Sequence, residues 1–295
     1  MTDKRFGIVQ ELVTAVLALA CLSPFYLLVA NMGKTSTDII TDPIGWPQSS
    51  EQFWENVSSV TNHSMFNFRN ALGCSVTITL TSLGLLVLFS SMTAWVLARN
   101  RARWSRWLFT FFLSAMVIPF QAVMLPMLST YRSVSDVIGI SLLRSYPGII
   151  IAYLGFGSSL SVFIIHGFIK GIPYELEEAA MIDGCSPEGT FFRIIFPILR
   201  PVQVTVLILN GIWIWNDFLL PSLLLSMNGD IKTLPIAFAS FIGTYVKQWD
   251  LILTAAFLAM IPVVILFIFL QRYLIKGMVS GAITKKRRYE YYGKK

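Results

Sequence analysis

The sequence predicts an all-α integral membrane protein with six transmembrane helices. Apolar residues make up 55% of the 295 residues, and the mean hydropathy is +0.66. Charged residues make up only 13% of the chain, where an average soluble domain has about 25%. The apolar residues also occur in six long blocks, not in the short alternating patterns of a soluble core.

Each apolar block is long enough to cross a bilayer as a helix, which takes about 20 residues. The predicted spans are Leu12–Met32, Ala71–Leu97, Trp107–Met127, Pro147–Phe168, Val202–Leu225 and Ile252–Leu274. Several ends carry the aromatic residues that anchor helices at membrane interfaces, such as Trp107 and Tyr273. We expect no cleaved signal peptide, although Ala18-Leu19-Ala20-Cys21 is similar to a lipoprotein cleavage site, because five further spans follow.

The distribution of basic residues predicts the orientation in the membrane. An even number of spans places both termini on one side, and that side would carry 17 of the 23 Lys and Arg residues. Because short cytoplasmic loops are enriched in Lys and Arg, we expect both termini in the cytoplasm. The net charge of +7 is then a signal of topology and of contact with lipid headgroups, and we expect no nucleic-acid partner.

The chain divides into three predicted regions. Residues 1–69 hold the first span and an external loop, residues 70–275 form the transmembrane core, and residues 276–295 form a basic cytoplasmic tail. The external loop is too short for an independent domain but large enough to contact an external partner.

The cytoplasmic loop at residues 169–199 carries the most information. Pro173 is suited to start a helix, and Glu175, Glu177 and Glu178 would lie in its first turns, where the helix dipole favours carboxylates. Gly184 is suited to end this helix. A short helix outside the membrane is therefore predicted.

One face of this short helix carries small residues. Leu176, Ala179, Ala180 and Asp183 share a face by their i, i+3, i+4, i+7 spacing. Another protein could approach such a face closely. A second helical stretch is predicted to start at Pro187, before the chain re-enters the membrane.

At this loop the sequence resembles the EAA motif of ABC importer permeases. The matching residues are Glu178-Ala179-Ala180, Asp183-Gly184, Ile195 and Pro197, with Cys185 in place of the family's alanine. The resemblance extends over most of the chain and is closest to the MalG-like permeases of carbohydrate importers. Further matching stretches are residues 94–99, 116–121, 215–221 and 271–285, and the ten residues Lys286–Lys295 extend past the usual family end.

The resemblance implies a type I ABC importer transmembrane fold in a bacterial inner membrane. It also implies the partners: two copies of a cytoplasmic P-loop ATPase, a second related permease, an external solute-binding protein, membrane lipid and a carbohydrate substrate. ATP and Mg would be bound by the ATPase subunits, with no cofactor in this chain. The chain itself would be a transport subunit and not an enzyme.

The resemblance also implies which residues couple ATP hydrolysis to transport. They are Glu178, Ala179, Ala180, Asp183 and Gly184, which would dock on the ATPases. A bulky charged residue at Ala180 or Gly184 is expected to abolish transport and leave membrane insertion intact.

Polar residues in the fifth span are candidates for the substrate path. Asn216 and Asp217 lie deep in the predicted span, where an ionisable group usually faces a cavity or a partner. Trp213 and Trp215 are close by, and aromatic rings stack well on sugars. Two interpretations stay open for these residues and for Gln121 in the third span: lining of the pore or substrate contact, and polar packing against a second permease.

Other chemistry finds little support in the sequence. Gly33-Lys34-Thr35 is similar to the end of a P-loop, but Leu28 stands where that motif needs glycine. The three cysteines have no metal-ligand spacing, and His63 and His166 are isolated. The alternatives to a sugar importer are an ABC permease for another small solute, a secondary transporter and a membrane-embedded enzyme. A secondary transporter usually shows repeated halves or several buried charges, and an enzyme needs clustered reactive side chains, none of which the sequence shows.

Overall fold

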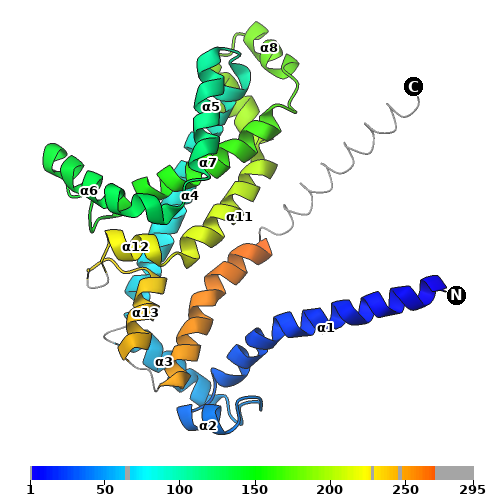
Figure 1. Ribbon diagram of the computed structural model, residues 1–295, viewed down its shortest axis with the longest axis vertical. Helices are drawn as coiled ribbons and strands as arrows, with labels where there is room; N and C mark the ends of the chain where they lie inside the picture. The colour runs from blue at the N-terminus through cyan, green and yellow to red at the C-terminus, as the bar shows by residue number, and fades with distance from the viewer. Residues whose placement is uncertain (1, 64–66, 227–228, 245–247, 270–295) are drawn as a thin grey trace. The chain divides into compact units, whose positions relative to one another are not determined.

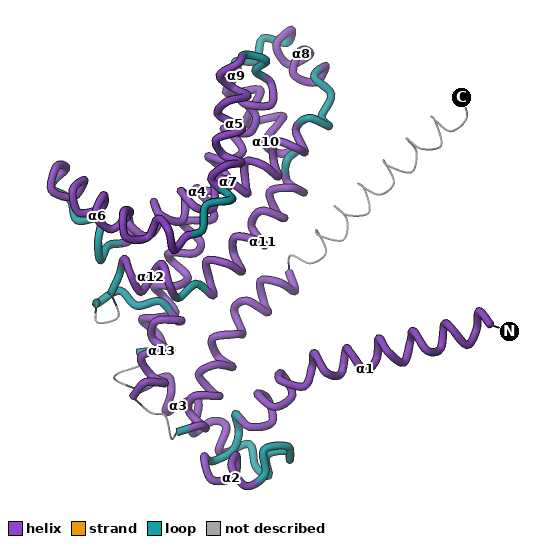
Figure 2. Tube along the Cα trace, in the orientation of Figure 1, coloured by secondary structure: helices purple, strands orange, loops and turns teal. Residues whose placement is uncertain are grey.

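The computed structural model describes residues 2–63, 67–226, 229–244 and 248–269 (Figure 1). Within these ranges every regular element is a helix (Figure 2). The helices are α1 (Thr2–Asn31), α2 (Ser36–Thr41), α3 (Glu51–Asn62), α4 (Phe68–Arg99), α5 (Arg103–Ala115), α6 (Phe120–Ile138), α7 (Tyr146–Ile169), α8 (Glu175–Ile182), α9 (Pro187–Thr190), the π-helical turn η1 (Phe191–Ile195), α10 (Phe196–Ile198), α11 (Arg200–Asn216), α12 (Leu219–Leu224), α13 (Leu234–Thr244) and a last helix, Trp249–Phe269.

Four single helices are long and apolar enough to cross a membrane. Within the described residues these are Gln10–Asn31, Phe68–Arg99, Tyr146–Ile169 and Trp249–Phe269. They agree with the first, second, fourth and sixth predicted spans, although residues 270–274 of the sixth lie outside the described residues. Two bent helix pairs raise the number of candidate spans to six if each pair is one span.

The third predicted span is wrong as one continuous helix. α5 ends at Ala115, α6 begins at Phe120, and the two axes differ by 107°. Pro119 explains the break, because a proline disfavours helical geometry at the residue before it and lacks an N–H of its own. Pro119 has extended backbone angles and forms the N-terminal boundary of α6.

The fifth predicted span, Val202–Leu225, is also wrong as one continuous helix. α11 ends at Asn216, and Asp217 is extended, with ψ of 124°. Pro221 has no N–H to bond the carbonyl of residue 217 and therefore disfavours a continuous helix here. It lies instead in the first turn of α12, where no intrahelical bond is required of it.

Contacts divide the chain into two compact units, each described by itself. The first comprises Met1–Leu72 and Ile236–Pro262, and the second comprises Gly73–Pro235 and Val263–Lys295.

In the first unit, hydrogen bonds hold the loop between the first two spans to the last helix. The buried Asn56 amide donates to the carbonyls of Met32 and Lys34, at 3.0 and 3.1 Å. The Thr254 hydroxyl donates to the same Met32 carbonyl at 3.0 Å, and the rings of Phe53 and Phe257 meet edge to face. Residues 32–63, which follow the first span, thus have their own hydrogen-bonded structure.

The second unit has its hydrophobic core where α4, α7 and α11 meet η1. Buried members include Leu86 and Leu97 of α4, Ile165 of α7, Phe191 of η1 and Val206 of α11. Polar bonds cross this core as well: the buried Asn210 amide of α11 donates to the Ser161 hydroxyl of α7 at 3.1 Å. Pairs of this kind hold helices together where lipid offers no hydrogen-bond partner.

One glycine of α7 permits close helix packing. A Cβ at Gly157 would overlap Leu86 Cδ1 of α4 and lie 2.9 Å from Asn210 Oδ1 of α11. A Cβ at Gly155 or Gly167 would meet nothing within 4 Å. Small residues let helix backbones approach in membranes, and in this chain Gly157 has that function.

Candidate functional site

The loop between α7 and α11 folds into a short capped helix, as predicted. α8 spans Glu175–Ile182 and lies at one end of the second unit, beyond the ends of α5 and α7 (Figure 1). Gly184 has φ of +81°, a conformation that glycine adopts without strain. Its N–H bonds the carbonyl of Met181 at 3.0 Å, and the N–H of Cys185 bonds that of Ala180 at 2.9 Å. This pair of bonds is a Schellman cap, so Gly184 ends α8 in the predicted way.

α8 has an outer face that the described part of the chain leaves uncovered. Glu175, Glu178, Ala179 and Ile182 follow the i, i+3, i+4, i+7 pattern, and all are exposed. Ile182 is 85% exposed, although it is a large apolar side chain. The exposed side of α8 is therefore the candidate docking surface of this site.

The prediction of which face of α8 is open to another protein was partly wrong. Ala179, Asp183, Gly184 and Glu178 are exposed, but Ala180 is only 4% exposed. α8 packs on α9 within the same chain, and Ala180 belongs to the inner side of α8. A bulky charged residue at Ala180 would therefore act first on the packing of α8 within this chain.

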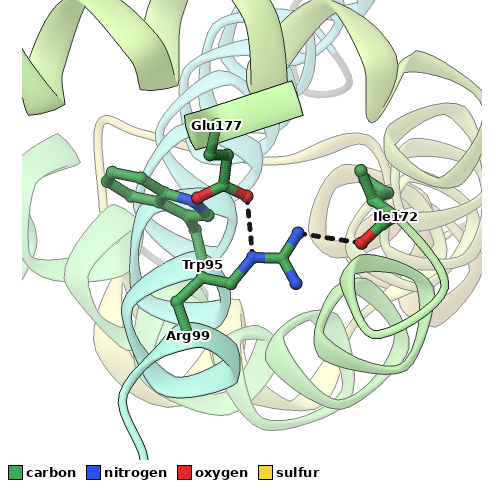
Figure 3. Close-up of polar contacts among 4 residues, drawn as sticks. All are labelled: Trp95, Arg99, Ile172 and Glu177. Carbon is green, nitrogen blue, oxygen red and sulfur yellow. Dashed lines mark hydrogen bonds and ion pairs between the residues drawn. The ribbon is translucent and has the colours of Figure 1, made fainter. Parts of the chain in front are cut away.

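The inner side of α8 is held by a buried ion pair (Figure 3). Glu177 is 1% exposed, and its two carboxylate oxygens accept hydrogen bonds from Arg99 Nε at 2.7 Å and from Trp95 Nε1 at 3.0 Å. Arg99 Nη2 also donates to the carbonyl of Ile172 at 3.1 Å, and its guanidinium lies 5.6 Å from the ring centre of Tyr174. The last turn of α4 thereby contacts both the start of α8 and the segment that leads into it.

Both oxygens of the buried Glu177 carboxylate accept a hydrogen bond, which is the condition for a charge to be stable when buried. Trp95 is itself held by the core, since its ring packs 5.3 Å from that of the buried Phe191. Removing Arg99 alone would leave the Glu177 carboxylate unpaired, and such a loss typically costs about 3–5 kcal/mol.

Sequence reasoning did not find this cluster. It assigned Glu177, like Glu175 and Glu178, to the favourable end of the helix dipole. A usable signal was present in Trp95 and Arg99, whose i, i+4 spacing at the end of a predicted span places two hydrogen-bond donors on one face. The spacing alone could not tell which of three neighbouring glutamates would meet them.

A second cluster surrounds the break between α11 and α12. The Asp217 carboxylate accepts from the Tyr153 hydroxyl of α7 at 3.2 Å and from the Leu219 N–H at 3.1 Å. Tyr153 is fully buried, and its ring meets that of Trp213 edge to face at 5.5 Å. Asp217 thus links α7 to the start of α12, which favours a packing role within this chain.

The other predicted substrate-path residues lie on α11 and α6. Asn216 is exposed and donates to the Ile212 carbonyl of its own helix, at 2.8 Å. Trp215 is half-buried on α11, and Gln121 is exposed in the first turn of α6. A mainly apolar cavity of about 480 Å³ lies between α5, α6 and α7, and none of the predicted site residues lines it.

We expect Asp217→Ala to lower the stability of the detergent-solubilised protein by about 1–3 kcal/mol, because Tyr153 and the Leu219 N–H both lose their acceptor. Thermal unfolding followed by tryptophan fluorescence measures the change. Asn216→Ala is the matched control and should stay within about 0.5 kcal/mol of the unchanged protein. Equal stability of the two variants would contradict the packing role of Asp217.

No metal centre is found in the part of the chain that the structure describes, where no three His, Cys, Asp or Glu side chains could hold an ion. His166 is buried and stacks on Phe109 with ring centres 3.9 Å apart. All three cysteines, Cys21, Cys74 and Cys185, are free thiols.

The capped α8 lies inside a stretch that matches a known family. Residues 87–280 match the family described as "Binding-protein-dependent transport system inner membrane component". The chain belongs to this family. It is therefore a multi-pass inner membrane component of a transport system that depends on a binding protein, and membership in this transport family, not in an enzyme family, agrees with the sequence-based prediction.

Relatives in the family are named as sugar permeases. The chain is 38% identical over 270 residues to the probable starch degradation products transport system permease protein AmyC of Thermoanaerobacterium thermosulfurigenes, covering 92% of this chain and 94% of AmyC. It is 34% identical to the melibiose/raffinose/stachyose import permease protein MelC of Bacillus subtilis, covering 92% of this chain and 95% of MelC.

A solved structure shares the fold of this family member. It is a chain in the crystal structure of a bacterial ABC transporter involved in the import of the acidic polysaccharide alginate. The TM-score is 0.78, with 19% sequence identity, over 92% of this chain and 98% of that one. The predicted fold of an ABC importer permease agrees with this similarity.

Proposed function

We propose that this chain is the permease subunit of an ATP-driven, binding-protein-dependent sugar importer. The observation that carries the proposal is α8. It is a capped helix at the end of the second unit, with one face bound to its own chain and the opposite face uncovered. A helix presented in this way can be displaced by a second protein and can transmit that displacement to the membrane helices as a rigid-body motion.

The partner on the outer face of α8 is a cytoplasmic ATPase in this proposal. Two ATPase copies bind ATP and Mg, close on each other, and displace the α8 helices of two permeases. Glu178, Ala179, Asp183 and Gly184 supply the docking surface, and Ala180 supports it from the inner side. The displaced helices switch the pore between inward-facing and outward-facing states, which is alternating access.

The substrate class follows from the relatives. AmyC and MelC are named as permeases for starch degradation products and for melibiose, raffinose and stachyose. A carbohydrate delivered by an external solute-binding protein is therefore the proposed substrate. Import of another small solute by the same mechanism is the alternative within this class.

Six spans with both termini in the cytoplasm complete the proposed topology. Each bent pair, α5 with α6 and α9–α10 with α11, counts as one span. The 17 basic residues on the side of the termini support the orientation.

A second permease is proposed to pair with this chain. The 18-residue apolar window within the first span, Gln10–Asn31, has a mean hydropathy of 2.3 and none of it is buried within the chain, whereas Ala30 and Asn31 at the end of the span are buried. The corresponding windows of α4 and α7 are 44% and 50% buried. The surface of the first span is thus available for a neighbouring permease.

Affinity purification of the full chain from its native membrane in mild detergent tests the proposal. We expect a P-loop ATPase and a second permease to co-purify, and we expect uptake of labelled oligosaccharide into proteoliposomes only with ATP and the binding protein. Uptake by the purified chain alone, without ATP, would instead identify a secondary transporter.

A further inference from the structure

The contacts around Glu177 join two elements that are far apart in the sequence. Arg99 and Trp95 belong to α4, and Glu177 lies 78 and 82 residues later, in α8. The two donors lie one helical turn apart on α4, so that together they bind both oxygens of one carboxylate (Figure 3). Two bonds from one rigid helix define the orientation of the carboxylate as well as its position.

The contact is placed opposite the surface that the proposed function assigns to the ATPase. The outer face of α8 is centred on Glu175, Glu178, Ala179 and Ile182, whereas Glu177 and Ala180 are the two buried residues of the helix. A displacement applied to the outer face therefore reaches α4 through Glu177.

α4 is suited to carry such a displacement. It is a continuous helix of 32 residues, about 48 Å long at 1.5 Å per residue, and no proline interrupts it. Trp95 and Leu97 near its end also belong to the hydrophobic core that includes α7 and α11. Movement of its last turn would therefore be shared with the membrane helices.

We propose that Arg99 and Trp95 are positioning residues that hold α8 on the end of α4 throughout the transport cycle, so that the two helices move as one body. The inference rests on the proposed function, because it needs an ATPase that displaces α8. It adds a specific role for Glu177: this residue anchors the coupling helix internally and does not contact the ATPase.

The first test removes the link without leaving a buried charge. In Arg99→Met/Glu177→Met both charged groups are replaced together, which is usually tolerated where single removal is not. We expect the double variant to insert, to keep the thermal stability of the unchanged protein and to co-purify with the ATPase. Its ATP-dependent uptake should fall by about tenfold or more, a change within the usual range of coupling between sites.

The exposed neighbour Arg101 provides the matched control, since Arg101→Met removes a charge from the same end of α4 and should leave uptake unchanged. Normal uptake by the double variant would overturn the inference. Loss of ATPase binding by the double variant would also overturn it, because the Arg99–Glu177 pair would then be needed for ATPase docking or for folding of the chain. Failure of the unchanged protein to bind an ATPase would instead reject the proposed function itself.

The second test replaces the ion pair by a covalent bond. Arg99→Cys/Glu177→Cys is made in a chain whose native cysteines are replaced by serine, and a short bismaleimide then joins the two thiols. We expect the joined protein to regain at least about half of the uptake lost in the unjoined one, as a restored coupling would allow. If joining abolished the remaining uptake, or if the thiols could not be joined in membranes, the pair would not be a permanent link.

Discussion

Ala179→Arg is expected to abolish ATP-dependent uptake and to release the ATPase, while the chain still inserts and keeps its stability. Ala179 is exposed on the outer face of α8, between Glu175 and Ile182, so an arginine there can extend into solvent without entering the core. The surface of the ATPase that receives α8 would fit a small residue at this position, and the longer, charged side chain would prevent docking. Uptake into proteoliposomes and co-purification of the ATPase measure the two losses.

The neighbouring alanine provides the contrast for this experiment. Ala180→Arg places a charge at a position that is 4% exposed, so this variant should lose thermal stability before any partner is added. Ala179→Ser, a small-for-small change, should keep uptake near normal. If Ala179→Arg still bound the ATPase and transported sugar, the outer face of α8 would not be the docking surface.

Gly157→Leu is expected to destabilise the helix bundle by about 3 kcal/mol or more, at the upper end of the range for an over-packed core. The new side chain would overlap Leu86 of α4 and crowd the Asn210 amide of α11, both of which are buried. Asn210 cannot easily move, because it bonds the Ser161 hydroxyl and the Val206 carbonyl. Thermal unfolding in detergent should show a clearly lower midpoint.

Gly155→Leu, two residues earlier on the same helix, is the control. A Cβ at Gly155 meets no atom within 4 Å, and the residue borders the apolar cavity between α5, α6 and α7. We expect a change of less than about 1 kcal/mol, since the added side chain enters open space and leucine has the higher helix propensity. Similar losses from both variants would show that Gly157 is not a specific close-packing position.

Several features of the loop between α7 and α11 could be predicted because their causes are local. Pro173, the acidic first turn and Gly184 predicted a short helix, and the structure has α8 from Glu175 to Ile182 with Gly184 in its cap. Each signal acts through backbone geometry within a few residues, so that no knowledge of distant contacts was needed.

The continuity of the third and fifth spans could not be predicted from hydropathy. Apolar residues continue past the breaks at Met116–Pro119 and at Asp217, so a hydropathy window sees one block in each case. The prolines at 119 and 221 were visible but did not decide between a kink and a full break. In the structure the neighbouring helix α7 helps to hold the break at Asp217, because the Tyr153 hydroxyl donates a hydrogen bond to the Asp217 carboxylate.

The apolar blocks alone were enough to predict a helical membrane protein, since about 20 apolar residues in a row suit little other than a bilayer. Local signals also predicted the position and the cap of α8. Which side of α8 is bound and which is exposed depends on tertiary contacts that the sequence did not reveal. Glu177 and Glu178 are chemically identical neighbours, and the burial of Glu177 alone follows from Trp95 and Arg99, about 80 residues away in the sequence. Periodicity defines the faces of a helix, but a contact with a distant element selects the face that is buried.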